Sequence, residues 1–344
     1  MLRAFANAFT IPDLRRKLIF TLLMIGVYRF GSWLPVPGID VALLRNATAT
    51  GAGGSIVGIL NVFAGGALQQ MAVFALGIMP YITASIILQL LAVVIPKLEE
   101  LQREGEQGRR KITQYTRYTT IGLAVLQSTG LVTLARSGQL FGSNVLPDAN
   151  TATIALIVLT LTAGTGMVMW LGELITQRGV GNGMSLLIYV SIISQFPSQL
   201  VIVRTEQGWD WLAGVLVLGM FLTVAVVFME QGQRRIPVQY ARRQVGRRSY
   251  GGQATYIPLK VNQSGVIPVI FASSLLYLPQ LLQSIIDWPW LANFNQTYLQ
   301  DASSWVFITV FAVLTIFFAY FYTAIAFNPA QQADIIRKQG GFIP

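Results

Sequence analysis

The sequence has no cysteine and no histidine among its 344 residues. Without cysteine, disulfide bonds and thiol chemistry are excluded. Without histidine, the chain lacks the commonest general base, the usual zinc ligand and the side chain that titrates near neutral pH. An enzyme built on this sequence would have to depend on carboxylates, lysine or serine.

Charged residues are also scarce, at 11% of the chain, whereas 53% of the residues are hydrophobic. That balance is typical of membrane proteins with several spans and not of soluble domains. The sequence has no G-x-x-x-x-G-K-[ST] loop for binding nucleotide phosphates. Arg15-Arg16-Lys17 precede the first apolar run as in a secretion signal, but no small-residue cleavage site follows. We therefore interpret this run as a retained first membrane helix.

Hydropathy predicts eight membrane-spanning helices. They cover residues 18–34, 71–95, 118–135, 152–171, 183–203, 211–228, 266–286 and 305–327. Twenty of the 24 Lys and Arg residues fall in segments on one side of this map. Because short loops rich in Lys and Arg stay in the cytoplasm, both ends of the chain are predicted to be cytoplasmic.

The stretch from Gly58 to Pro96 is the part around which we expect the fold to be organised. Its second half, Met71 to Ile95, is apolar and long enough to cross the bilayer. Its first half is too short to cross, and glycines interrupt it. Such backbone is tolerated at membrane depth only beside protein or a water-filled cavity, so it predicts a half-inserted element. An interfacial amphipathic turn between two ordinary helices is the alternative.

Two predicted cytoplasmic segments differ in their charge. Leu98 to Arg117 mixes both signs and is predicted to be a solvated loop. Gln231 to Lys260 holds seven basic residues and no acidic residue. Its arginine pairs, interleaved with tyrosines, suit the phosphates of RNA or the carboxylates of a protein partner. Contact with anionic lipid, or a strong topology signal alone, is the alternative.

Two stretches of nine residues share one pattern, GIMPYITAS at Gly77–Ser85 and GVIPVIFAS at Gly265–Ser273. The predicted topology runs them in opposite directions, which indicates an inverted repeat with its functional site at mid-depth between the two halves. We expect Pro80 and Pro268 to loosen the two helices and the glycines to allow close approach. The general abundance of Gly and Pro in membrane helices is the alternative explanation.

The predicted mid-membrane site is aliphatic. Ile78 and Ile82 lie on one face of the second span, and Ile270 takes the matching place in the seventh. A solute transporter would bring charges or unwound carbonyls to this depth, and the sequence offers almost none. An aliphatic constriction instead resembles a hydrophobic gate, which excludes water by dewetting yet yields to a wider object. Ordinary core packing is the alternative.

Four stretches resemble the SecY family, the channel subunits of the general protein translocase. They are FALGIMPYITASIILQLL, QRGVGNGMS, EQGQRRIPVQYARRQVGRR and PLKVNQSGVIPVIFASS, and the likeness covers essentially the whole chain. The resemblance implies an all-α polytopic fold of two pseudo-symmetric halves around an hourglass pore that opens sideways. Residues 1–203 would form the first half, with helices 1–5 and a plug at about 56–70. Residues 204–344 would form an incomplete second half, with helices 6–8 and a basic loop at about 229–265.

The resemblance also assigns roles to individual residues. The pore ring would comprise Ile78, Ile82, Met184, Ile188 and Ile270, with Met184 standing where relatives carry isoleucine. The plug would include Asn61, Phe63, Gly65 and Gly66. The lateral gate between the second and seventh helices would include Pro80, Gln89, Asn182 and Pro268. Docking of a motor or ribosome would fall to Arg235, Arg247 and Arg248.

The resemblance further implies a passive channel in the cytoplasmic membrane of a bacterium, with neither enzymatic activity nor a cofactor. Work would come from the SecA motor ATPase or from a translating ribosome. SecE and SecG homologues, preprotein signal sequences and membrane lipids are the other expected partners. Family members continue for two more helices, whereas this sequence stops at Pro344, so we infer that it is truncated. An inverted-repeat secondary transporter of a small solute remains the alternative function.

Overall fold

The computed structural model describes residues 10–40, 43–44, 61–138, 145–146, 150–240, 243–245, 248–250, 255–285, 288–299, 304–327, 329–338 and 341–342. The chain divides into two compact units. Unit 1 comprises Met1–Val201 and Ser273–Phe311, and unit 2 comprises Ile202–Ala272 and Ala312–Pro344.

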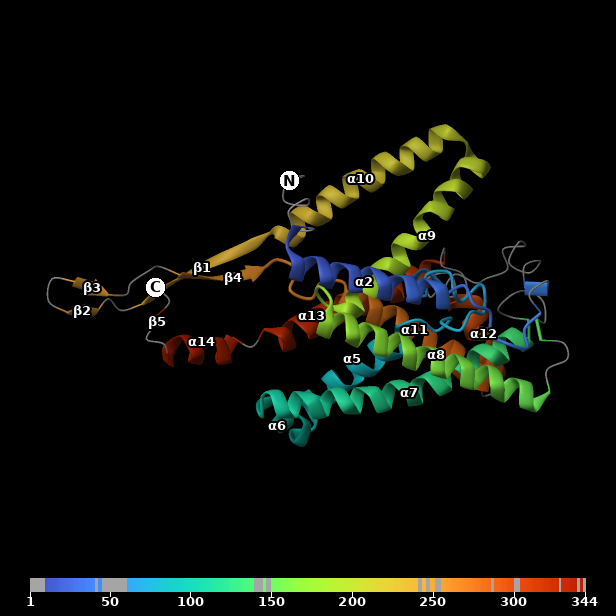
Figure 1. The fold of residues 1–344 in the computed structure, drawn as a ribbon, viewed down its shortest axis with the longest axis horizontal. Coiled ribbons are helices and arrows are strands. Elements are labelled where there is room, and N and C mark those ends of the chain that lie inside the picture. Colours follow the sequence, from blue (N-terminus) through green and yellow to red (C-terminus); the bar gives the residue numbers. More distant parts are fainter. Residues whose placement is uncertain are drawn as a thin grey trace. The chain divides into compact units, whose positions relative to one another are not determined.

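Unit 1 is helical. Its described helices are α2 (Pro12–Gly31), α5 (Met79–Val94), α6 (Pro96–Arg103), α7 (Glu106–Arg136), α8 (Thr151–Arg178), most of α9 (Gly183–Gln207), the later part of α11 (Ile267–Ile285), α12 (Pro289–Phe294), the π-helical turn η1 (Asn295–Leu299) and the start of α13 (Trp305–Ala326). The long helices α7 and α8 pack side by side (Figure 1), while α7 also contacts α5 and α8 also contacts α2.

The core of unit 1 is an apolar cluster from α2, α8, α9 and the turns before α5. Its buried members are Tyr28, Phe74, Ile78, Val168, Leu171, Ile175 and Leu187. Each is at most 2% exposed. Glycine allows the close approach that this packing needs, because a Cβ on Gly164 of α8 would collide with the backbone carbonyl of Val73.

Unit 2 carries a β-hairpin that the sequence reading did not predict. Strand β1 (Gln233–Tyr240) pairs antiparallel with β4 (Thr255–Lys260). The short strands β2 (Arg243–Val245) and β3 (Arg248–Tyr250) extend the ribbon (Figure 1), and β5 (Gly341–Phe342) pairs with the other edge of β1. The remaining elements are α10 (Trp209–Gln231), α14 (Pro329–Lys338) and the adjoining parts of α9, α11 and α13. The all-α class therefore holds for the bulk of the chain, with this hairpin as an addition.

Each of the eight predicted spans contains a helix. Among the described residues, five helices are long and apolar enough to cross a membrane by themselves: α7, α8, α9, α10 and α13. The helix α5 has only 16 residues, and α2 carries several charged side chains near its ends. Several spans are thus confirmed, which is the pattern of a multi-pass membrane protein.

The second predicted span is wrong over its first eight residues. Helix α5 begins at Met79, and residues 64–78 form turns, interrupted by an isolated antiparallel bridge between Ala72 and Pro35. The backbone there bonds to another segment, because Val73 N donates to Leu34 O at 2.9 Å and Val36 N donates to Met71 O at 3.0 Å. Met71 itself has φ of 42°, which no helix accommodates.

The first charged segment is not a loop. Residues 98–117 form most of α6 and the first turns of α7, joined by a turn at Gly105 with φ of 75°. Arg110 Nη2 lies 2.9 Å from Glu106 Oε1 one turn earlier on α7. The mixed charges that suggested a solvated loop therefore belong to solvated helix faces.

Candidate functional site

The two repeat copies start with the same local backbone. Gly77 and Gly265 both have positive φ, 55° and 59°, and in each copy the helix begins two residues later. Pro80 and Pro268 are then the second residues of α5 and α11. Proline in the first turn leaves no helical hydrogen bond unmade. The prediction that these prolines loosen the helices is wrong, because they stand where helices commonly begin.

The match continues into the first hydrogen bonds of the two helices. Ile82 N donates to Ile78 O at 3.1 Å, and Ile270 N donates to Val266 O at 3.5 Å. Ile82 and Ile270 therefore occupy equivalent positions in two copies of one local structure.

Four of the five predicted ring residues come together in unit 1. Ile78 is 1% exposed and belongs to the core, and Ile82, Met184 and Ile188 are half-buried and pack against it. The sulfur of Met184 lies against Gly172 of α8, where a Cβ would not fit. Ile270 is 6% exposed and belongs to unit 2. The four residues form one apolar group, and their role as a ring stays a prediction.

The predicted plug residues lie in a buried turn segment, which we define as residues 61–77. Asn61 and Phe63 are 5% and 8% exposed. Asn61 holds the segment together, since its carbonyl accepts from Gly66 N at 3.0 Å and its Oδ1 accepts from Gln69 N at 3.2 Å. Residues 56–60 of the predicted plug lie outside the described residues. The described part buries most of its apolar side chains inside unit 1, with Val62 exposed at 38%, and its half-inserted position in a membrane stays a prediction.

Helices α2 and α9 support the turn segment from one side. Tyr28 of α2 and Ser191 of α9 share a hydrogen bond of 2.6 Å between their hydroxyl oxygens. A Cβ on Gly65 would lie 3.1 Å from the Cα of Ser191, and a Cβ on Gly66 would collide with the amide of Gln195. The two glycines thus let the backbone of the segment approach α9 closely.

Two predicted lateral-gate residues have ordinary local surroundings. Asn182 caps α9, because its Oδ1 accepts from Met184 N at 3.0 Å and from Ser185 N at 3.3 Å. Gln89 is exposed on α5. The structure gives Asn182 a helix-capping role, and a gate role for either residue stays a prediction.

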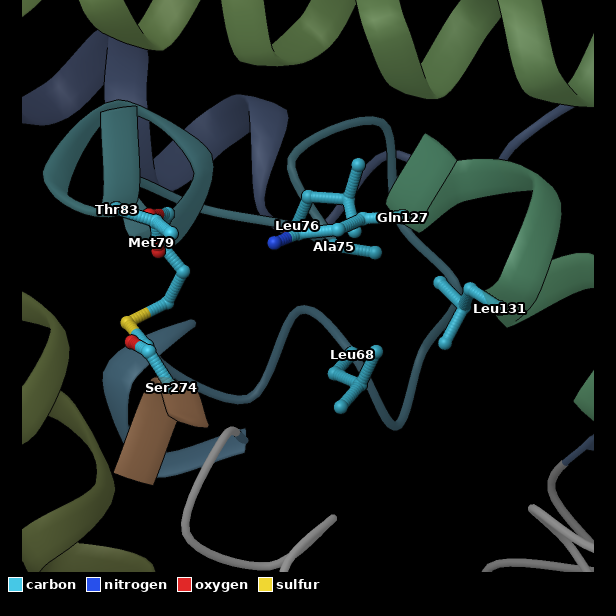
Figure 2. Close-up of a pocket in the computed structure, with 8 residues that line it drawn as sticks. All are labelled: Leu68, Ala75, Leu76, Met79, Thr83, Gln127, Leu131 and Ser274. Carbon is cyan, nitrogen blue, oxygen red and sulfur yellow. The ribbon is translucent and has the colours of Figure 1, made fainter. Parts of the chain in front are cut away.

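A small cavity of about 30 Å³ lies where the turn segment, α5, α7 and α11 meet. Figure 2 shows its lining: Leu68, Ala75, Leu76, Met79, Thr83, Gln127, Leu131 and Ser274. The space is large enough for a water molecule. The buried hydroxyl oxygen of Ser274 has no hydrogen-bond partner among the described residues, and Gln127 is only 7% exposed. The sequence reading missed this polar group, although a glutamine inside an apolar run was its signal.

The predicted docking arginines are described only in part. Arg235 is exposed on β1, and its guanidinium carbon lies 4.8 Å from the ring centroid of Tyr256 on β4. Arg247 lies outside the described residues, and only the backbone of Arg248 is described, on β3. Docking therefore stays a prediction, now placed on a hairpin and not on an irregular loop.

Comparison with known sequences decides the family. The SecY family model matches residues 72–344. The protein translocase subunit SecY of Streptomyces scabiei is 55% identical, and the match covers 100% of this chain and 81% of that protein.

The chain belongs to the SecY family.

Solved structures share the fold of this chain. A protein-conducting channel matches with a TM-score of 0.58 at 17% identity, over 96% of this chain and 77% of that one. The idle yeast Ssh1 complex bound to the yeast 80S ribosome matches with a TM-score of 0.56 at 16% identity, over 78% of this chain and 59% of that one. At such identities the likeness concerns the fold.

Proposed function

We propose that this chain is the channel subunit of a bacterial protein translocase. It moves unfolded preproteins across the cytoplasmic membrane and releases apolar segments sideways into lipid. The observation that carries the proposal is the apolar group of Ile78, Ile82, Met184 and Ile188 beside the buried turn segment, in a chain of the SecY family. A small-solute transporter is not favoured, because none of the residues in this group is charged.

The apolar group supplies the barrier of the resting channel. A constriction of aliphatic side chains excludes water and ions by dewetting and opens around a wider polypeptide. The turn segment acts as the plug, since it is buried against the same side chains and is built from turns and not from a spanning helix. A substrate has to displace the segment before it can pass.

The cavity between α5, α7 and α11 supports a sideways exit. Thr83, Gln127 and Ser274 bring polar side chains to a seam of otherwise apolar residues. Polar groups inside a membrane are costly and mark functional positions. An apolar signal sequence that enters this seam replaces weak contacts between the polar side chains with apolar contacts. The polarity of the seam therefore sets how hydrophobic a segment must be to pass sideways into lipid.

The basic hairpin is the docking element for a SecA motor or a ribosome, and SecE and SecG homologues complete the complex. Arg234 and Arg235 are exposed on β1, which suits phosphate or carboxylate partners. The work of translocation comes from these partners, so the chain itself is not an enzyme. Both termini are cytoplasmic, as the distribution of Lys and Arg indicates.

Ion conductance tests the proposal. Ile82→Asn places an amide in the apolar group, and we expect the resting conductance of the reconstituted channel complex to rise several-fold because the amide retains water. Leu159→Asn is the control, since Leu159 on α8 is 68% exposed on the helix surface and outside the group. An Ile82→Asn complex that inserts normally but conducts no more than the control would contradict the proposal.

A further inference from the structure

Arg29 is a basic side chain of the α2 span that reaches the turn segment. It lies in the last turn of α2 and is half-buried. Its Nη1 donates to the carbonyl oxygen of Gly65 at 3.0 Å and to the hydroxyl oxygen of Ser194 at 2.9 Å. One guanidinium nitrogen therefore joins three elements, namely α2, the turn segment and α9.

The two hydrogen-bond partners of Arg29 are neutral groups. Among the ion pairs between described residues, none includes Arg29. A charged side chain at membrane depth is costly unless polar groups solvate it, and here a backbone carbonyl and a hydroxyl do so. Hydrogen bonds from a charged donor are also stronger than those between neutral groups.

The surrounding residues are arranged so that this contact can form. The hydrogen bond between Tyr28 and Ser191 holds α2 to α9 directly beside Arg29. Gly65 has φ of 65°, and a Cβ on it would lie 3.0 Å from Nη1 of Arg29. Any larger residue at this position would crowd the guanidinium and strain the turn. The predicted plug glycine is thus required by the arginine and not only by the turn.

We propose that Arg29 is a positioning residue that latches the turn segment in its resting place. This inference rests on the proposed channel function and deepens it. The latch binds a backbone carbonyl, so it does not depend on the side chains of the segment. When the segment moves away, the bond to Gly65 breaks while the bond to Ser194 on α9 can persist. The guanidinium then keeps one hydrogen-bond acceptor, which lowers the free-energy cost of moving the turn segment away.

The absence of native cysteine makes a direct test possible. Leu68→Cys places a thiol in the turn segment, where the side chain is 4% exposed. We would measure its reaction rate with a polar thiol reagent in the membrane-embedded complex, without substrate. Arg29→Gln should raise that rate about tenfold, which corresponds to about 1.4 kcal/mol of lost latching. Arg29→Lys, which keeps the charge and a donor, should restore part of the protection.

Two controls separate a latch from general loosening. Leu171→Cys, at a side chain of α8 that is 1% exposed, should remain unreactive in the Arg29→Gln background. Arg136→Gln removes another last-turn arginine, on α7, and should leave the reaction at position 68 unchanged. Equal reactivity of the two thiols in the Arg29→Gln background would overturn the latch in favour of general destabilisation.

Conductance of the same variants distinguishes this inference from the proposed function. An unchanged reaction rate at position 68 in Arg29→Gln overturns the latch, whatever the conductance does. A raised rate together with a raised resting conductance supports the latch and the channel. A raised rate with unchanged conductance supports the latch as a positioning contact and counts against the turn segment as the plug of a channel.

Discussion

The two copies of the repeat share a backbone but not an environment. In the first copy, Ile78 is 1% exposed at the start of α5, and a Cβ on Gly77 would lie 3.3 Å from the Cα of Ala64. In the second copy, Val266 at the matching position is 65% exposed, and Gly265 has open space around it among the described residues. The turn that starts the helix is thus packed in the first copy and exposed in the second.

The difference comes from the residues that precede each copy. Gly77 N donates to the backbone carbonyl of Phe74 at 2.8 Å, inside the buried turn segment. Gly265 N donates to the side chain of Asn262 at 3.1 Å, after the end of the β-hairpin. Local sequence therefore sets the turn and the helix start, whereas the preceding segment sets the burial. A buried turn segment precedes the first copy and a β-hairpin precedes the second, so the same pattern begins in two different surroundings.

The largest effect is expected at the contact between α8 and the turn segment that precedes the first copy. Gly164→Ala on α8 forces a Cβ into the carbonyl of Val73, which should destabilise the protein by about 3 kcal/mol. Gly166→Ala, two residues along the same helix, meets Ile121 at an ordinary 3.5 Å and should stabilise by up to about 1 kcal/mol. Thermal unfolding of the purified variants in detergent measures both. Similar shifts for the two variants would show that the close approach at Gly164 is absent.

The next effect compares the two glycines directly. Both Gly77→Ala and Gly265→Ala place a Cβ at positive φ, which costs about 1–2 kcal/mol. Only Gly77→Ala also crowds Ala64, so it should cost about 1 kcal/mol more. The measurement is the difference between the unfolding midpoints of the two variants. A larger loss of stability in Gly265→Ala than in Gly77→Ala would contradict the tighter packing of the first copy.

A smaller effect is expected at Asn262, whose side chain holds the turn before the second copy. Asn262 Oδ1 accepts from Gly265 N and from the hydroxyl of Ser264, each at 3.1 Å. Asn262→Ala should cost about 1 kcal/mol because two donors lose their acceptor at a half-buried site. Asn262→Asp keeps the acceptor and serves as the control. If both variants unfold like the parent protein, the turn does not depend on this side chain.

The smallest effect is expected at the prolines. Because Pro80 and Pro268 stand in the first turn, Pro80→Ala and Pro268→Ala should each change stability by less than about 1 kcal/mol. Pro197, inside α9, is the contrasting position, and its replacement by alanine should straighten or stabilise that helix. A large loss of stability in Pro80→Ala would show that this proline does more than begin α5, whereas the lateral-gate role of both prolines stays a separate prediction.

Much of the fold could be read from the sequence, because apolar runs and basic loops follow simple physical rules. Runs such as 211–228 are apolar throughout and match α10 closely. The error at Met71–Ile78 arose because hydropathy does not distinguish an apolar helix from apolar turns that bond to a distant segment at Leu34 and Val36. The hairpin was not predicted because the interpretation of this segment rested on its charge. The missed signal was the alternation of less exposed Ile236 and Val238 with exposed neighbours, which is the pattern of a strand.

The candidate site was predictable to the extent that it follows the repeat pattern. Ile78 and Ile82 were found from their spacing, and Met184 and Ile188 from family resemblance, and all four join one apolar group. Arg29 was not singled out, because its partner is a backbone carbonyl and no sequence pattern marks such a contact. The polar side chains that line the cavity, Thr83, Gln127 and Ser274, were not predicted as a group because they come from three separate helices.

Site-specific crosslinking to a stalled secretory precursor tests the central claim most directly. A photoreactive residue at position 82, in the apolar group, should crosslink to the precursor. The same residue at position 224, on the α10 face where Val224 is 63% exposed, should crosslink to lipid or to partner subunits instead. Precursor crosslinks at position 224 and none at position 82 would contradict a passage through the apolar group.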